Sequence, residues 1–227
     1  MYEFEPPVEN AFGQQRKLSS VIFHSGSNSK CNPQDTFMSK SIIRKEIKDL
    51  INKNISTLAS SSREICEKII GSEEYKNASE IYAYMALSDE VDLTDVIKQA
   101  LLDGKKVAVP KIISKDEGIM EFYYLDSQKA LTQQTSNGVY GILEPDQSMP
   151  AAPGPVLKTL ILVPGRAFTK EGDRLGRGKG YYDRYLNKKR LPNITIAGVC
   201  FDFQIKKSLP VDDRDVKMDV VYTTSQE

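Results

Sequence analysis

The residues best suited to chemistry lie in one stretch, Arg174 to Asp183, which reads RLGRGKGYYD. Three glycines alternate there with Arg177 and Lys179, so the backbone can approach a ligand closely while the cations supply positive charge. If a helix begins at Tyr181, its free backbone amides and the positive end of its dipole face the same point. The pattern favours a loop that holds phosphate groups.

The common phosphate-binding motifs do not fit this loop. A Walker A motif needs Ser or Thr after its lysine, whereas Gly180 follows Lys179, and Asp173 stands where the first glycine is required. The dinucleotide-binding GxGxxG pattern fails because Tyr181 replaces its last glycine. On residue types and spacing alone, a phosphate-binding loop, a solvated turn and an RNA-contacting loop all remain open.

Composition limits the other kinds of chemistry. Lys plus Arg and Asp plus Glu both number 31, so no global basic excess drives nucleic-acid binding. The single histidine, His24, argues against a His-based triad or metal site. Cys31, Cys66 and Cys200 are widely spaced, which argues against a disulfide framework and favours a reducing, cytoplasmic setting. The apolar stretch 21–23 near the start is too short for a signal peptide or a membrane span.

The chain divides into two parts by composition. Residues 1–38 lack apolar periodicity and are predicted to be a flexible extension, with Met38 as a candidate functional start. Residues 39–227 are predicted to form a single α/β domain. Its first helix follows a Ser39 cap, and its apolar positions run at helical spacing from Ile43 to Leu58. Lys40 and Arg44, four residues apart, share one face of that helix.

The remaining pattern alternates helices and strands. Helices are predicted from a capping box at 61–64 to Gly71, from Asp92 to Gly104 and over 181–189, and strands over 81–87, 106–113, 120–125, 157–163, 194–200 and 219–223. This alternation predicts a three-layer α/β sandwich whose mostly parallel central sheet is covered by helices on both faces. The strand over 157–163 is predicted to be central. It leads directly into the glycine loop, at an edge where α/β proteins bind ligands.

A longer stretch, PGRAFTKEGDRLGRGKGYYDRYL at 164–186, resembles the signature of the 5-formyltetrahydrofolate cyclo-ligase family. Weaker matches follow the family's order at 40–44, 84–92 (YMALSDEVD), 109–110, 141–145 (GILEP) and 210–219 (PVDDRDVKMD). The resemblance implies a ligase of one-carbon metabolism that cyclises 5-formyltetrahydrofolate to 5,10-methenyltetrahydrofolate. It implies phosphorylation of the formyl oxygen by ATP, with release of ADP and phosphate in the presence of Mg²⁺.

The resemblance also assigns residues by matching positions. It implies ATP contacts from Lys40, Arg44, Arg174, Leu175, Gly176, Arg177, Gly178, Lys179, Gly180, Tyr181 and Tyr182. Substrate contacts are implied for Met85, Glu90, Arg177, Gly178, Lys179, Gly180 and Tyr181, with Lys179 and Arg177 as the catalytic pair. Asp183 and Asp215 match the family's Mg²⁺ positions. The implied partners are ATP and a reduced folate. From the sequence itself we expect a cytoplasmic monomer with no nucleic-acid or membrane partner.

Three departures from the family pattern leave substrate preference and rate open. Arg166 stands where an apolar residue is usual, Thr169 where Asp is common, and Leu93 where Thr often occurs. Two alternative functions remain: a non-catalytic relative that binds RNA or nucleotide through the RLGRGKGYYD loop, and a phosphosugar isomerase-like enzyme that would not need ATP. The zero net charge and the matching acidic positions weigh against RNA binding.

Overall fold

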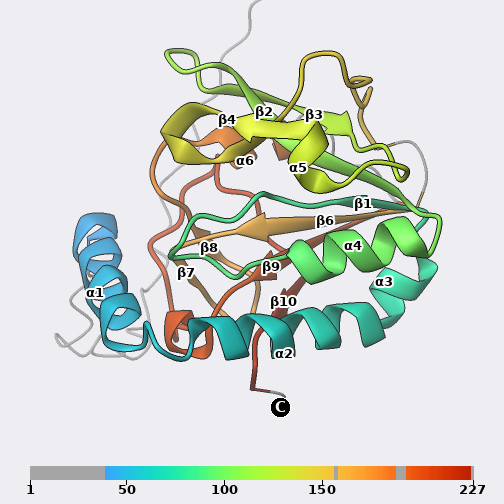
Figure 1. Cartoon of the computed structure of the whole chain (residues 1–227). Helices are drawn as coiled ribbons and strands as arrows, with labels where there is room; N and C mark the ends of the chain where they lie inside the picture. Colours follow the sequence, from blue (N-terminus) through green and yellow to red (C-terminus); the bar gives the residue numbers. More distant parts are fainter. Residues whose placement is uncertain (1–38, 156–157, 188–192, 226–227) are drawn as a thin grey trace, which may run out of the picture. The chain divides into compact units, whose positions relative to one another are not determined.

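The computed structural model describes residues 39–155, 158–187 and 193–225 (Figure 1). The predictions for residues 1–38, including Met38 as the functional start, lie outside these residues, as do position 157 of the predicted strand and positions 188–189 of the predicted helix. A six-stranded sheet forms the centre of the fold. Its strands, in order across the sheet, are β10 (Val220–Tyr222), β9 (Ile194–Val199), β6 (Thr159–Pro164), β1 (Glu80–Tyr82), β2 (Lys106–Ser114) and β3 (Ile119–Tyr124).

The sheet is mostly parallel, as predicted. Every neighbouring pair of strands runs parallel except β2 and β3, which are antiparallel. The chain proceeds to one side of the sheet after β1 and to the other side after β6, so these adjacent strands mark a topological switch point. The loops that follow β1 and β6 leave the sheet at the same edge, which is where α/β proteins bind ligands.

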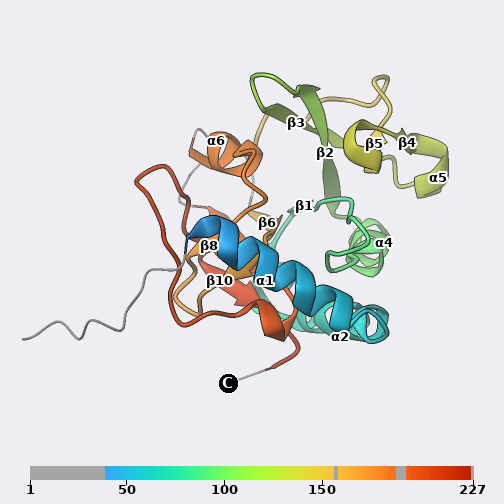
Figure 2. The same cartoon turned by 90° about the vertical axis from the view of Figure 1, so that its left-hand side faces the viewer.

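Alternate residues of each strand pack into two separate cores, and this explains the three layers. Ile81, Val107 and Leu160 face the core formed with α1 (Lys40–Lys53), α2 (Leu58–Gly71) and α4 (Thr94–Leu102). Their neighbours Tyr82 and Ile161 face the second core, which is closed by α6 (Tyr181–Asn187). Figure 2 shows α6 on the opposite side of β6 from α2. Helices therefore cover both faces, as predicted, and the second face is covered by the short helix α6.

The boundary between the first two helices differs from the prediction. Helix α1 ends at Lys53, where the backbone N–H of Asn54 caps the carbonyls of Leu50 and Ile51. The apolar spacing continues to Leu58, but Ile55 is 69% exposed and Leu58 is the first residue of α2. The predicted capping box at 61–64 is wrong, because these residues lie inside α2. Burial of Leu58 and Ser62 against the core extends this helix toward its N-terminus.

The other elements are small. They are α3 (Glu73–Asn77), α5 (Leu131–Gln134), the hairpin of β4 (Thr135–Asn137) and β5 (Leu143–Pro145) with the 3-10 turn η1 (Val139–Gly141), the hairpin of β7 (Ala167–Phe168) and β8 (Arg174–Leu175), and the 3-10 turn η2 (Asp202–Gln204). Strand β1 is shorter than the predicted 81–87. The β7–β8 hairpin lies between β6 and the glycine loop, which therefore does not follow the central strand directly. Within the described ranges, no helix is long and apolar enough to cross a membrane.

Candidate active site

The glycine loop spans 176–180, between the end of β8 and the start of α6. Gly178 and Gly180 have φ angles of +101° and +68°, a left-handed conformation that favours glycine. A Cβ on Gly176 would lie 2.9 Å from Nη1 of Arg174, so this position also has little room for a side chain. The predicted helix start at Tyr181 is confirmed. The glycines therefore set the path of the loop backbone.

The first turns of α1 contact the loop and the C-terminal segment. Nε of Arg44 donates a hydrogen bond to the Gly176 carbonyl at 2.9 Å. Nζ of Lys40 lies 2.8 Å from a carboxylate oxygen of Asp215 and 3.1 Å from one of Asp212. The hydrogen bond to Asp215 is the main cause that raises the pKa of Lys40 above its ordinary value. The helix face predicted from the spacing of Lys40 and Arg44 thus lies against the glycine loop.

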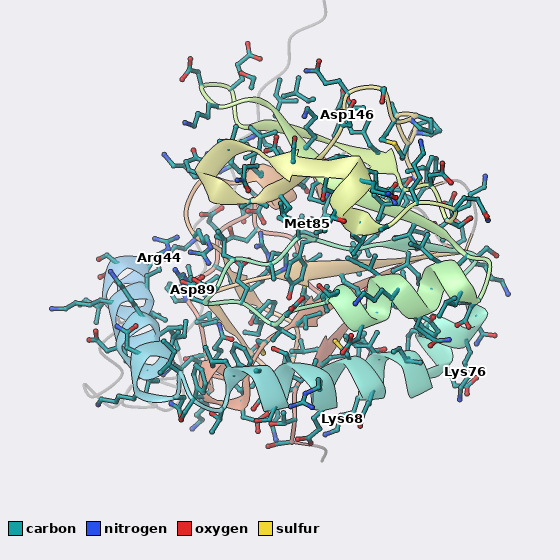
Figure 3. The ribbon with its side chains drawn as sticks, viewed as in Figure 1. Arg44, Lys68, Lys76, Met85, Asp89 and Asp146 are labelled. Atoms are coloured by element: carbon teal, nitrogen blue, oxygen red, sulfur yellow. The ribbon has the colours of Figure 1, made fainter. Side chains whose placement is uncertain are left out.

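Arg177 joins the glycine loop to the loop that follows β1. Its Nε donates to a Glu90 carboxylate oxygen at 2.8 Å, and its Nη2 pairs with Asp89. Arg166, one of the departures noted in the sequence analysis, pairs with the other Asp89 oxygen at 2.7 Å. Glu90 also accepts from the Leu87 backbone N–H at 3.1 Å. Figure 3 shows Arg44 and Asp89 on the same side of the ribbon, whereas Lys76 lies on the other side.

Arg174 is buried beneath the glycine loop. The residue is 6% exposed. Its Nη1 donates to the Pro164 carbonyl at 3.1 Å, and its Nη2 donates to Asp183 Oδ1 at 2.7 Å. These contacts tie the end of β6 to the first turn of α6. The charge of Arg174 is therefore largely balanced by Asp183, one of the two predicted Mg²⁺ ligands.

Two cavities open beside the loop and differ in character. One has a volume of about 340 Å³ and mostly apolar walls that include Met85, Pro110 and Ile112. The other has a volume of about 530 Å³ and a polar lining rich in cations and carboxylates. Both volumes fall within the range of roughly 300–1,000 Å³ typical of ligand sites. Both cavities are lined by Gly176, Lys179, Gly180 and Asp183.

The fold brings every predicted site residue to one of these cavities. The apolar cavity is lined by Met85, Glu90, Arg174, Gly176, Arg177, Lys179, Gly180, Tyr181, Tyr182 and Asp183. The polar cavity is lined by Lys40, Arg44, Leu175, Gly176, Gly178, Lys179, Gly180, Asp183 and Asp215. Residues far apart in the sequence thus converge on one place. The role of each residue stays a prediction.

Lys179 and Tyr182 are among the cavity residues that have unused hydrogen-bonding groups. Nζ of Lys179 makes no hydrogen bond or ion pair with any residue that the structure describes, and Lys179 lines both cavities. The Tyr182 hydroxyl is buried and has no partner among the same residues, although Tyr182 lines the apolar cavity. Burial raises the pKa of Tyr182 well above its ordinary value, so this hydroxyl keeps its proton. Both groups are free to bind a ligand.

The sequence analysis missed one wall of the apolar cavity. Tyr140 and Glu144 line this wall from the β4–β5 hairpin. Glu144 is 5% exposed and accepts hydrogen bonds at 3.3 Å from the backbone N–H groups of Ile112 and Val139. Tyr140 has a φ angle of +62°, an uncommon conformation for a residue with a side chain. The weak family match at 141–145 is the signal that points to this hairpin.

The residues present fit a Mg²⁺ ion that is bound together with nucleotide. Asp183 and Asp215 both line the polar cavity, and carboxylate oxygens are suitable ligands for this hard cation. Within 39–155, 158–187 and 193–225, no three His, Cys, Asp or Glu side chains converge into a metal cage. Mg²⁺ usually binds through one or two carboxylates together with phosphate and water, so two carboxylates in a phosphate-sized cavity suffice.

The Asp89 cluster predicts a pH-dependent contribution to stability. Burial alone would raise the pKa of Asp89, but the hydrogen bond from Arg177 and the charges of Arg177 and Arg166 outweigh it and lower the pKa. A lowered pKa stabilises the fold above the unfolded value, near 3.8, and this stabilisation is lost as the pH falls through the folded value. We expect Asp89→Asn to reduce the free energy of unfolding by about 1 kcal/mol at neutral pH.

Urea denaturation at neutral pH and at about pH 3 measures this difference. The difference in the free energy of unfolding between wild type and Asp89→Asn should shrink at the lower pH, because Asp89 is then increasingly protonated. A gap of the same size at both pH values would show that the charge of Asp89 does not stabilise the cluster.

The fold and the site together define an α/β protein with a glycine-lined, charged cavity at the switch point of its sheet. The model of the 5-formyltetrahydrofolate cyclo-ligase family matches residues 37–224. The chain therefore belongs to the 5-formyltetrahydrofolate cyclo-ligase family, which confirms the family predicted from the sequence.

Individual relatives agree with this assignment. The chain is 31% identical over 200 residues to the probable 5-formyltetrahydrofolate cyclo-ligase of Schizosaccharomyces pombe, covering 81% of this chain and 96% of that protein. It is 34% identical over 163 residues to the 5-formyltetrahydrofolate cyclo-ligase of Mus musculus, covering 69% and 79%. The solved structure of Aquifex aeolicus 5,10-methenyltetrahydrofolate synthetase superposes with a TM-score of 0.69 at 30% identity, covering 83% and 91%.

Proposed function

We propose that this chain is an ATP- and Mg²⁺-dependent ligase that converts 5-formyltetrahydrofolate to 5,10-methenyltetrahydrofolate. The proposal is supported by membership of the cyclo-ligase family over residues 37–224. The observation that carries it in the structure is the junction of two unlike cavities, one apolar and one cationic, at Lys179. A flat heterocycle fits the apolar cavity, and a triphosphate fits the polar one.

The nucleotide contacts follow from the charges of the polar cavity. Lys40 and Arg44 approach it from α1, and Lys179 reaches it from the glycine loop. Their positive charges suit the β- and γ-phosphates of ATP, and the glycines let loop N–H groups face the phosphate oxygens. Lys40 would exchange part of its pairing with Asp215 for phosphate. Asp215 would then be free to act as a ligand.

The folate contacts follow from the apolar cavity. Met85 supplies an adaptable apolar wall, and the free Tyr182 hydroxyl supplies a hydrogen-bonding group within it. Glu90 is 10% exposed at its side chain and retains acceptor capacity for an N–H group of the pterin, since a carboxylate can accept about four hydrogen bonds. Arg177 holds Glu90 at the cavity through its 2.8 Å hydrogen bond. The residues that line both cavities would then place the formyl oxygen of the folate beside the terminal phosphate of ATP.

The reaction then needs orientation and charge stabilisation more than covalent help from the protein. The formyl oxygen attacks the γ-phosphorus, the bond to the β-phosphate oxygen breaks and ADP leaves. The neighbouring folate nitrogen attacks the activated formyl carbon and loses its proton, and phosphate departs with the formyl oxygen. Lys179 would stabilise the negative charge that spreads over the transferring group, with Arg177 beside it. The two cavities would hold oxygen and phosphorus in line.

Mg²⁺ bound with ATP would neutralise charge on the phosphate oxygens. Asp183 and Asp215 are the residues that would hold it, from α6 and from the C-terminal segment. Arg174 would keep the carboxylate of Asp183 oriented through its 2.7 Å hydrogen bond to Oδ1, which leaves Oδ2 for the ion.

The RNA-binding alternative has no support, since Arg177 of the loop is engaged by Asp89 and Glu90 instead of forming an open basic surface.

A direct assay tests the proposed function. Purified protein is mixed with 5-formyltetrahydrofolate and Mg²⁺, with or without ATP, and the methenyl chromophore and ADP are recorded together. We expect the chromophore only with ATP, in equal amount to ADP. Cyclisation without nucleotide, or none with it, would contradict the proposal.

A further inference from the structure

Arg184, in the first turn of α6, contacts the backbone of the glycine loop. We propose that Arg184 is a positioning residue: it fixes the backbone carbonyl of Lys179 and thereby aims the Lys179 ammonium at the junction of the two cavities. The kinetic part of this inference rests on the proposed function. The structural part, that Arg184 holds the loop in place, does not.

The guanidinium of Arg184 links three segments of the chain. Its Nη2 donates a hydrogen bond to the carbonyl of Lys179, and its Nε donates to the carbonyl of Gly118 at 2.9 Å. Its carbon Cζ lies 5.9 Å from the centre of the Tyr181 ring. A guanidinium presents its donors in a planar, rigid fork, so these contacts fix its orientation. The β2–β3 turn thereby serves as an anchor for the glycine loop.

Two glycines leave the room that this guanidinium occupies. A Cβ on Gly118 would lie 1.7 Å from Nη2 of Arg184, which is impossible without displacement of the guanidinium. A Cβ on Gly180 would lie 3.0 Å from Nη1. Gly118 also has a φ of +62°, which suits glycine in its own right. Gly118 lines neither cavity, so its link to the loop runs through Arg184.

The contact matters because the ammonium of Lys179 has no partner among the residues described, and its side chain has four rotatable bonds. The direction of the side chain is therefore set by the backbone, and the backbone between Lys179 and Gly180 is held by Arg184. The backbone N–H of Arg184 donates to the Gly180 carbonyl at 3.0 Å, and this bond does not need the arginine side chain, so only the Lys179 carbonyl depends on the guanidinium. Loss of the guanidinium would let the loop sample other conformations.

A double-mutant cycle tests whether Arg184 acts through Lys179. We expect Arg184→Ala to lower kcat by about 10- to 100-fold, as is usual when a reacting group is displaced slightly. In the Lys179→Ala background, Arg184→Ala should have almost no further effect, because the group that it positions is absent. Arg184 also lines the polar cavity. If the two effects multiply, Arg184 touches the nucleotide directly and the positioning role is overturned.

Limited proteolysis tests the same contact without any enzymatic activity. Trypsin cleaves after lysine, so the Lys179–Gly180 bond reports how firmly this carbonyl is held, and mass spectrometry identifies the cut. Cleavage at this bond should become several-fold faster in Arg184→Ala and in Gly118→Ala. Arg63→Ala, which removes an exposed arginine from α2, is the matched control and should leave it unchanged.

Equal cleavage of the Lys179–Gly180 bond in wild type and Arg184→Ala would overturn the inference. Should Gly118→Ala fail to fold, the exposed Arg184 position still decides the outcome. The two proposals also fail separately. If the wild-type protein lacked ATP-dependent cyclisation, the proposed function would fall, whereas faster proteolysis would still establish that Arg184 holds the loop.

Discussion

Replacing Lys179 with alanine is expected to lower kcat by about 10²- to 10³-fold, the usual cost of removing one group that stabilises transition-state charge. The free energy of unfolding should change by less than about 0.5 kcal/mol, as for other exposed positions. The reason is the absence of a partner: Nζ of Lys179 contacts no acceptor in the described part of the chain, so the fold loses no hydrogen bond or ion pair. Its charge is therefore available to a ligand.

Initial rates of methenyl formation and urea denaturation measure the two effects of this change. Lys98→Ala, on the exposed face of α4, is the control for loss of one lysine. Lys179→Arg separates charge from shape, because a planar guanidinium is bulkier than an ammonium and cannot occupy the same point. A kcat for Lys179→Ala equal to that of wild type would exclude the glycine loop from the chemical step.

Replacing Asp183 with asparagine is expected to raise the Mg²⁺ concentration for half-maximal rate by at least about tenfold, since one of the two proposed carboxylate ligands loses its charge. The asparagine oxygen can still accept from Arg174 Nη2, so the residue pair remains in contact. The charge of this buried arginine would lose its counter-ion, however, at a cost of about 1–3 kcal/mol in stability. Rates should be recorded well below the melting temperature.

Mg²⁺ titrations at saturating ATP and folate provide the measurement. Asp215→Asn should shift the titration in the same direction, because Asp215 is the other carboxylate of the proposed pair. Asp49→Asn, an exposed position on α1 that lines neither cavity, should leave the titration unchanged. If Asp183→Asn needed no more Mg²⁺ than wild type, Asp183 would serve only as the partner of Arg174.

Local patterns predicted much of the fold correctly. The helix beginning at Tyr181, the β1–α4–β2 unit and a central strand before the glycine loop all follow from apolar spacing and cap residues, which depend on near neighbours. Predictions failed where tertiary packing overrode a local signal. The serines at 61–62 form a plausible cap, yet burial of Leu58 starts α2 earlier. Residues 83–87 look like a strand, but strand pairing on both sides of β1 ends at Tyr82.

In the candidate site too, local sequence predicted some features and tertiary packing decided the others. The RLGRGKGYYD stretch identified the loop, because glycine freedom and cationic charge are properties of the residues themselves. The sequence did not indicate that Arg177 pairs with Asp89 and Glu90, nearly 90 positions earlier, or that Arg166 shares the Asp89 carboxylate. These contacts depend on the adjacency of β1 and β6, and strand order is decided by packing of the whole sheet.

The sequence by itself determined the family, the class of fold and the residues that carry charge. Only the tertiary structure decided which of these charges remain available to bind a ligand. It balances Arg174 with Asp183 and leaves the ammonium of Lys179 without a partner in the described part of the chain, where an apolar and a polar cavity meet. The physical reason is that residue type sets what a side chain can donate or accept, whereas long-range proximity in the folded chain sets what it is already bound to.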